Sequence, residues 1–434
     1  MNNNVSPLDS SYNRLDEAHR AWHLALMGYH NISDFRAGIN SAIQALRNIT
    51  FMLQNQKNNL QNFDSWYMGW QTKMRNNPIL KELLQARNTI VKQEDLLLHS
   101  TAIAKTKGWI NFQETKFTFN PINNSYEVAK GFYDNYAKCF PVENIVKNRL
   151  IFEFERKWVY EKLPEYELLE AIAQAYGFFI EMLRDASRNF SLPTVSKPSG
   201  NYCSGDLNNK GKLRCMTLTP HERCLIFSFE TGKVINMKTY SISKNLDDLK
   251  VAGERYGHEL NSTDALSLLD GVFSDEYPFN QVKIFSRAAI ANLKTDKHLV
   301  PVSFIFFDKT KPPFIMGLQF QNQEQKIISI DKLAMEILKN NGSFVLTMAE
   351  TWVFKSQEDF LKQYKKEEKD AESMLQISCI TKDELKIISI PFRKGLFGKI
   401  IFSKPDVNDY STDEDHPFYI FRPIIKALKE VIKQ

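Results

Sequence analysis

The stretch "NISDFRAGINSAIQALRNITFMLQNQKN" (residues 31–58) carries the clearest periodic pattern of the chain. Its apolar side chains recur at three- and four-residue steps: Ile39, Ile43, Leu46, Ile49 and Leu53. This is the period of a helix that buries one side. A side-chain oxygen of Ser33 or Asp34 can cap the first turn. The stretch therefore predicts a long amphipathic helix that needs other helices to cover its apolar side.

The neighbouring segments have the same character. "LDEAHRAWHLALMGYH" (15–30) and "FDSWYMGWQTKM" (63–74) repeat the helical spacing. A fourth helix is expected to begin at Asn77-Pro78, because an asparagine cap followed by proline is typical of a helix start. Short polar links join all four, so we expect an antiparallel helical bundle over about residues 15–100.

The rest of the first part mixes patterns. Residues 109–119 alternate like a short hairpin, and helical patterns return in 143–163 and 164–188. The segment 191–212 is the richest in Pro, Gly, Ser and Asn, which favours a domain boundary. We therefore predict a helical domain over 1–195 and a linker over 196–212.

Beyond the linker, short strand-like runs alternate with helices. Thr231-Gly232 is a hairpin turn signal between two such runs. Further runs follow in 298–321 and 374–402, with helical stretches near 331–340 and 356–370 and a closing helix. Hairpins mixed with separate helices predict an α+β domain over 213–434 with a mainly antiparallel sheet. The predicted fold class is thus α+β with two domains.

Length and composition agree with a folded, two-domain protein. The chain has 434 residues, 43% hydrophobic and 25% charged, with a formal net charge of +5. That charge permits an anionic partner without requiring one. Neither a secretory leader nor an apolar stretch of membrane-spanning length is visible, so we expect a cytoplasmic protein with reduced thiols and no membrane contact.

The stretch "QARNTIVKQEDL" (85–96) places a cation among apolar residues of the fourth helix. Arg87 lies three or four residues from apolar neighbours on both sides, with Asn88 and Lys92 beside it. A guanidinium on a packing face requires an anionic or hydrogen-bonding partner. That partner could be an internal carboxylate, a second copy of the chain or a bound phosphate. Arg87, Asn88 and Lys92 are therefore the candidate ligand-binding and catalytic residues.

This helical region resembles the HEPN domains, in which an arginine and a polar residue precede a histidine near the end of a helix. Many HEPN proteins are metal-independent ribonucleases of bacterial toxin–antitoxin and defence systems. The resemblance covers about residues 15–100 and implies a homodimer formed through the bundle. Arg87 and Asn88 match the motif, but Lys92 stands where histidine is expected.

The lysine changes the chemistry that the resemblance implies. Its ordinary pKa is about 10.4, so it is a poor base at neutral pH and a good fixed charge beside a phosphate. We therefore expect an intracellular HEPN-like protein that binds RNA or a nucleotide. The alternatives are a metal-independent endoribonuclease and a non-catalytic structural subunit. Whether the chain is an enzyme stays open at this point.

Other candidates have plainer explanations. Trp66, Tyr67 and Trp70 could stack on bases, but at helical spacing they are more often core residues. A second group offers metal ligands without a tight spacing: Cys203, Cys215, His221 and Cys224. A third group matches a common pattern of metal-dependent nuclease sites: Asp308, Asp383, Glu384 and Lys386. Glu350 and Trp352, at the end of an expected strand, could line a pocket. No metal and no cofactor is assigned from the sequence.

Overall fold

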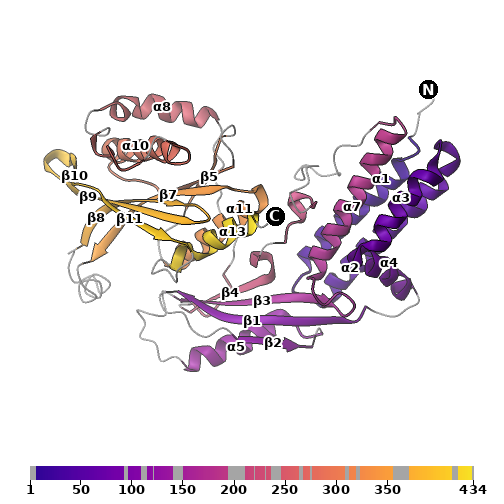
Figure 1. Ribbon diagram of the computed structural model, residues 1–434. Coiled ribbons are helices and arrows are strands. Elements are labelled where there is room, and N and C mark those ends of the chain that lie inside the picture. Colours follow the sequence, from indigo (N-terminus) through magenta and orange to yellow (C-terminus); the bar gives the residue numbers. More distant parts are fainter. Residues whose placement is uncertain are drawn as a thin grey trace.

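The computed structural model describes most of the chain (Figure 1). The described residues are 6–91, 96–108, 115–120, 122–139, 150–193, 211–218, 220–229, 231–235, 246–262, 267–273, 276–307, 312–318, 323–354, 371–412 and 419–432.

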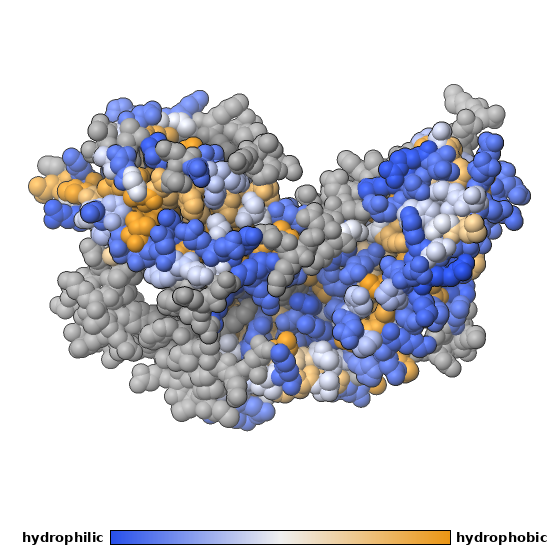
Figure 2. Space-filling model, in the orientation of Figure 1, coloured by the Kyte–Doolittle hydropathy of each residue, from blue (hydrophilic) through white to orange (hydrophobic). Residues whose placement is uncertain are grey.

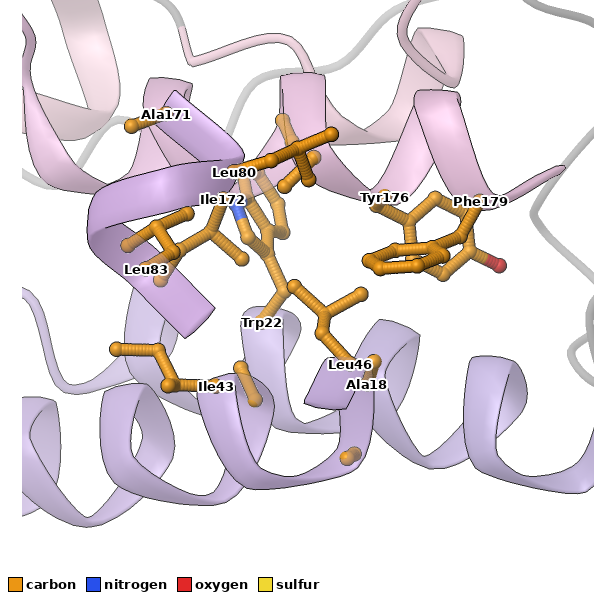
Figure 3. Packing of buried hydrophobic residues seen from close by; sticks show 14 of the residues in the cluster. Ala18, Trp22, Ile43, Leu46, Leu80, Leu83, Ala171, Ile172, Tyr176 and Phe179 are labelled. Atoms are coloured by element: carbon orange, nitrogen blue, oxygen red, sulfur yellow. The ribbon is translucent and has the colours of Figure 1, made fainter. Parts of the chain in front are cut away.

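Five helices form the N-terminal core: α1 (Asp9–Met27), α2 (Ile32–Asn55), α3 (Phe63–Asn76), α4 (Pro78–Val91) and α7 (Leu168–Asn189). α1 and α2 run side by side as a hairpin, and α7 packs against α1, α2 and α4. Figure 3 shows Trp22 at the centre, between Leu46 of α2, Leu80 of α4 and Ile172 of α7. The Trp22 indole N–H donates to the Leu169 carbonyl at 2.9 Å, so the buried ring keeps its hydrogen bond. The four predicted N-terminal helices are confirmed, but the core also requires α7 from much later in the chain.

A four-stranded antiparallel sheet follows the first helices. Its strands are β1 (Leu98–Gly108), β2 (Thr115–Phe119), β3 (Leu150–Tyr160) and β4 (Cys224–Ser228), in the order β2-β1-β3-β4. α5 (Ser125–Cys139) covers one face of this sheet, where Tyr133 packs on Phe152 and Phe227. Two short 3-10 helices, η2 (Arg214–Met216) and η3 (Pro220–Arg223), lead into β4.

The predicted helix over 143–163 is wrong for its described part, because residues 150–160 form β3. Glu153, Glu155 and Arg156 lie within this strand, and all three are buried. Glu153 pairs with Lys105 at 2.8 Å and Glu155 with Arg223 at 3.0 Å. These cations come from β1 and η3, so no local pattern reveals that the acids are neutralised inside a sheet.

The C-terminal half contains a second antiparallel sheet. Its strands are β5 (Val302–Phe306), β6 (Phe314–Gly317), β7 (Phe344–Phe354), β8 (Ala371–Ile380), β9 (Glu384–Lys394), β10 (Ile400–Phe402) and β11 (Asp406–Ser411). The order is β10-β9-β8-β7-β5-β6, and β11 pairs with the first part of β9.

Helices cover both faces of this seven-stranded sheet. α10 (Phe279–Asp296) packs on one face, with α8 (Leu246–Leu260) outside it. α11 (Gln323–Asn340) and α13 (Arg422–Ile432) pack on the other face. Figure 1 shows this layered unit at the opposite end of the molecule from α1–α4. In Figure 2 hydrophobic surface gathers near β10, where Leu396 is 86% exposed and Ile401 is 40% exposed.

The α+β class with antiparallel sheets is confirmed. Thr231-Gly232 forms the predicted turn, with Gly232 at φ 66° and a bridge between Phe227 and Val234. The division into domains at 196–212 stays a prediction; β4, which follows that segment, pairs with β3, which precedes it. The predicted helix over 356–370 lies outside the described residues. No helix within the described part of the chain combines the length and apolar character that crossing a bilayer requires.

Candidate metal centre

Two histidines stand one turn apart on α1. His19 and His23 are separated by four residues, so a helix projects both from the same side. The face they share is covered by η2, which carries Cys215. His19 is buried, whereas His23 and Cys215 are half-buried. The fold thus brings together three side chains that are all common ligands of transition metals.

The ligand atoms of these residues converge. His19 Nε2 lies 3.2 Å from His23 Nε2 and 3.2 Å from Cys215 Sγ. All three atoms lie within 4.8 Å of one another. In a tetrahedral zinc site, bond lengths of about 2.05 Å to nitrogen and about 2.3 Å to sulfur separate two nitrogens by about 3.3 Å and a nitrogen from a sulfur by about 3.6 Å. The two 3.2 Å separations are close to these values, and the third separation is at most 4.8 Å.

Hydrogen bonding alone satisfies His19 poorly. Both close contacts involve His19 Nε2, which, depending on the tautomer, has either one lone pair or one N–H to share between His23 and Cys215. The other ring nitrogen, His19 Nδ1, is buried and has no hydrogen-bond partner among the described residues. A metal ion, by contrast, accepts one lone pair from each of the three side chains.

The electrostatics favour neutral imidazoles. Burial, followed by the nearby His23, lowers the pKa of His19 to about 4. Burial also lowers the pKa of His23. Metal ligation requires the unprotonated ring, so both residues are ready to bind at neutral pH. Asp16 raises the pKa of His19 and Glu222 raises that of His23, whereas Arg20 lowers that of His19, so charges of both signs lie near the site.

The segment that carries Cys215 is held against α7 by specific contacts. Lys212 pairs with the Glu170 carboxylate, which also accepts from the Leu218 backbone N–H at 2.9 Å. Gly177 allows this approach, because a Cβ atom there would lie 1.5 Å from the Gly211 carbonyl oxygen. These contacts position residues 211–218 over α1 and α7.

Of the metal ligands considered from the sequence, the structure describes the side chains of Cys215 and Cys224, and these belong to different clusters. Cys203 lies outside the described residues, as does the side chain of His221, which belongs to η3. Cys224 lies near Glu153 and Glu155 instead of Cys215. Those two carboxylates are already paired with Lys105 and Arg223, so this second cluster is explained by ion pairs.

The candidate residues on α4 are placed only in part. Arg87 is half-buried and Asn88 is exposed, while Lys92 lies outside the described residues. The buried side of α4 is formed by Ile79, Leu80, Leu83 and Ala86. Burial lowers the pKa of Arg47, and Arg87 adds a smaller contribution in the same direction, so the two cations lie near one another. Anion binding by Arg87, Asn88 and Lys92 stays a prediction, and so does the homodimer.

The remaining candidates have structural partners. Tyr67 and Trp70 are core residues, and Trp66 is half-buried beside them. Lys386 pairs with Asp409 at 3.2 Å across β9 and β11, so its charge has a structural partner.

Of the pocket candidates in the second half, Glu350 accepts from the Leu299 backbone N–H. Asp308 and the side chain of Trp352 lie outside the described residues.

Sequence reasoning missed the histidines of α1. The available signal was His19-x3-His23, which is a helical ligand pair when a third ligand approaches it. Cys215 was considered, but only with partners close to it in sequence. The chain separation between His19 and Cys215 is 196 residues, which no local spacing rule spans.

Comparison with known proteins identifies a phage family. A family model described as "Bacteriophage lambda protein ea47" matches residues 1–393. Protein ea47 of Escherichia phage lambda is 32% identical over 145 residues, which are 33% of this chain and 35% of the phage protein. The chain thus aligns with about a third of that relative's length. No solved structure matches.

These matches overturn the HEPN prediction and the functions drawn from it, RNA binding and ribonuclease activity in a bacterial defence or toxin–antitoxin setting. One phage family spans residues 15–100 together with most of the remaining chain, and nothing indicates a HEPN domain. The structure gives a physical reason for the error. The first four helices are not a self-contained bundle, because α7 supplies part of their core, and an Arg-Asn pair on one helix is too short to identify a fold.

Proposed function

The chain belongs to the family of bacteriophage lambda protein ea47, and we propose that it is a metal-binding member that holds one zinc ion through His19, His23 and Cys215. The observation that carries the proposal is the convergence of three ligand atoms from α1 and η2 around one point.

The ligand set selects the class of metal. Two imidazoles and a thiolate are soft or borderline donors, which suit zinc and copper and not magnesium or calcium. Of these two metals we choose zinc, because it is not redox-active and it accepts nitrogen and sulfur ligands in tetrahedral geometry. Three protein ligands would leave a fourth position for a water molecule or another ligand.

Metal binding would connect distant parts of the chain. A zinc ion held by α1 and η2 closes a loop of 196 residues between His19 and Cys215. Such a link stabilises the folded state, because the unfolded chain cannot hold the ligands together. It would add to the Lys212–Glu170 pair in fixing residues 211–218 over the helical core.

The test uses the full chain purified without chelators. We expect about one zinc per chain by elemental analysis. After zinc removal, cobalt(II) should give the intense thiolate-to-cobalt charge-transfer absorption of a cysteine-ligated site. Cys215→Ser should abolish that absorption, and His19→Ala and His23→Ala should weaken metal binding by at least about tenfold.

Cys224→Ser is the matched control. Cys224 is half-buried like Cys215 and close to it in sequence, but it lies in the other cluster, beside Glu153 and Glu155. Its replacement should leave the cobalt spectrum unchanged. A spectrum that survives in Cys215→Ser, or a folded chain that binds neither zinc nor cobalt, contradicts the proposed function.

A further inference from the structure

A second site lies at the far end of the helical core from the sheet. A pocket of about 570 Å³ opens between the turn before α3 and the turn after α7. Its polar lining residues include Asn59, Gln61, Asn62, Asn189 and Ser191. This volume lies in the range of small-molecule sites, but the lining is more polar than such sites usually are.

The polar groups of the pocket are uncharged. Carboxamides and hydroxyls both donate and accept hydrogen bonds, and no Asp, Glu, Lys or Arg is among the lining residues. A phosphate or carboxylate ligand would require a cationic partner, and an ammonium ligand would require an anionic one. The lining therefore suits an uncharged ligand with many groups that donate and accept hydrogen bonds.

Two backbone positions keep such groups at the pocket. Asn62 has φ 58° and Ser191 has φ 53°, in the left-handed region that usually selects glycine. Ser191 follows the C-terminal cap of α7, where its N–H donates to the Arg188 carbonyl and the Leu192 N–H to the Ser187 carbonyl. Serine carries a conformational cost of about 1 kcal/mol relative to glycine there, whereas asparagine tolerates this region better, and both positions present polar side chains at the pocket.

One aromatic ring provides a platform. The half-buried Trp66 lines the pocket, and its indole N–H donates to Asp185 Oδ2 at 2.8 Å, which holds the ring in place. Phe190 meets Trp66 edge to face, with ring centroids 5.2 Å apart at 70°. The two rings therefore form no parallel slot for a flat base, whereas the C–H side of a saccharide requires only one aromatic ring.

We propose that this pocket binds an uncharged saccharide ring, with Trp66 under the ring and Asn62, Asn189 and Ser191 around its hydroxyls. The proposal does not depend on the zinc site. The pocket is formed by α3, α7 and their adjoining turns, and none of the three metal ligands lines it.

Saturation-transfer NMR on the full chain tests the proposal, with the methyl glycosides of glucose, galactose, mannose and N-acetylglucosamine as probes. At least one should bind, with a change in tryptophan fluorescence. Trp66→Leu should weaken binding by about tenfold, and Asn62→Gly, which keeps the left-handed backbone, should also weaken it. Met68→Ala is the control, because Met68 is exposed on α3 outside the pocket.

Adenosine and uridine are included to separate the ligand classes. If they bind and no glycoside does, the saccharide assignment is overturned in favour of a nucleobase. If no probe binds to a chain that circular dichroism shows to be folded, the proposal is also overturned. Equal binding by the wild type and Trp66→Leu has the same consequence.

Discussion

His19 lies in the interior as a neutral imidazole. It is 2% exposed, and burial together with His23 lowers its pKa to about 4 from 6.5. The folded state therefore resists taking up a proton that the unfolded chain takes up readily. The same property that prepares His19 for a metal makes the metal-free protein sensitive to acid.

We predict that the metal-free protein loses stability as the pH falls. For a depressed pKa the contribution is fully present above pH 6.5 and disappears as the pH falls toward 4. His19 alone should account for about 2 kcal/mol by pH 5. Urea unfolding in EDTA at pH 7.5, 6 and 5 measures this. His19→Asn should flatten the profile by that amount. The remaining slope combines His30 and His23, whose pKa values are also lowered, with Glu167, whose pKa burial raises to about 7 and which acts in the opposite direction. A variant profile as steep as that of the wild type would contradict the assignment.

Single residues were predictable when their role was local. The asparagine expected to start α4 does cap it, since the Leu80 N–H donates to the Asn77 side chain at 3.1 Å. The role of Cys215 was not predictable, because its partners come from α1. For Arg87 the local pattern was misleading. Its position among apolar residues suggested burial, but α4 turns Ala86 inward and leaves Arg87 half-buried.

At the scale of elements, the contact between α1 and α2 depends on a glycine. A Cβ atom on Gly38 would lie 2.5 Å from the Ala25 backbone nitrogen and 2.7 Å from its Cα. Backbone atoms of a packed helix cannot move aside as a flexible side chain can. Gly38 therefore sets how closely the two helices approach.

Gly38→Ala should destabilise the protein by about 2 kcal/mol or more, although alanine is the better helix former. Gly69→Ala is the matched control, because Gly69 lies in α3 and a Cβ there has no neighbour within 4 Å. That change should stabilise the protein by up to about 1 kcal/mol. Thermal unfolding of both variants measures the difference. Stability changes of the same sign would show that the close approach at Gly38 does not limit packing.

Gly177→Ala should weaken zinc binding without altering a ligand. The new methyl group would displace the Gly211 carbonyl, which lies 1.5 Å from the Cβ position, and with it the segment that presents Cys215. We expect at least about a tenfold loss of zinc affinity in competition with a chelating dye, in a protein that retains its helical content. An unchanged affinity would mean that Gly211 does not position Cys215.

The elements themselves were predicted unevenly, for a physical reason. α2 buries one stripe, so its period is visible in the sequence. β3 is buried on both faces, and its Arg156 is satisfied by Ser100 and Ser125 from β1 and α5, so neither alternation nor polarity marks it as a strand. Such a strand is recognisable only with its neighbours in place.

At the scale of the whole molecule, α11 links the two sheets. It belongs to the layer over the seven-stranded sheet, but its Ile327 packs with Ile151 of β3 and Ile226 of β4. Lys339, near its end, lies 4.0 Å from Glu222 of η3. These contacts connect the C-terminal sheet to the segment next to the proposed zinc site.

Ile327→Ala should separate the unfolding of the two parts. Removing this buried isoleucine should lower the interaction free energy between the four-stranded sheet and the C-terminal part by about 2–4 kcal/mol. A single calorimetric transition should then become two. Ile330→Ala is the control on the same helix. Ile330 belongs to the C-terminal core cluster, so its loss should lower the stability of that part without loosening the link. If Ile327→Ala keeps one transition, the sheets are coupled by other contacts.

The sequence by itself determined the four N-terminal helices, the α+β class and several C-terminal hairpins, because hydrophobic period and turn chemistry act over a few residues. Only the tertiary structure decided that α7 completes the helical core, that Glu153 and Glu155 are buried acids, and that His19, His23 and Cys215 meet. Each of those outcomes depends on partners far apart in the chain, and a contact between such partners is specified by the packing of the whole and not by any local pattern.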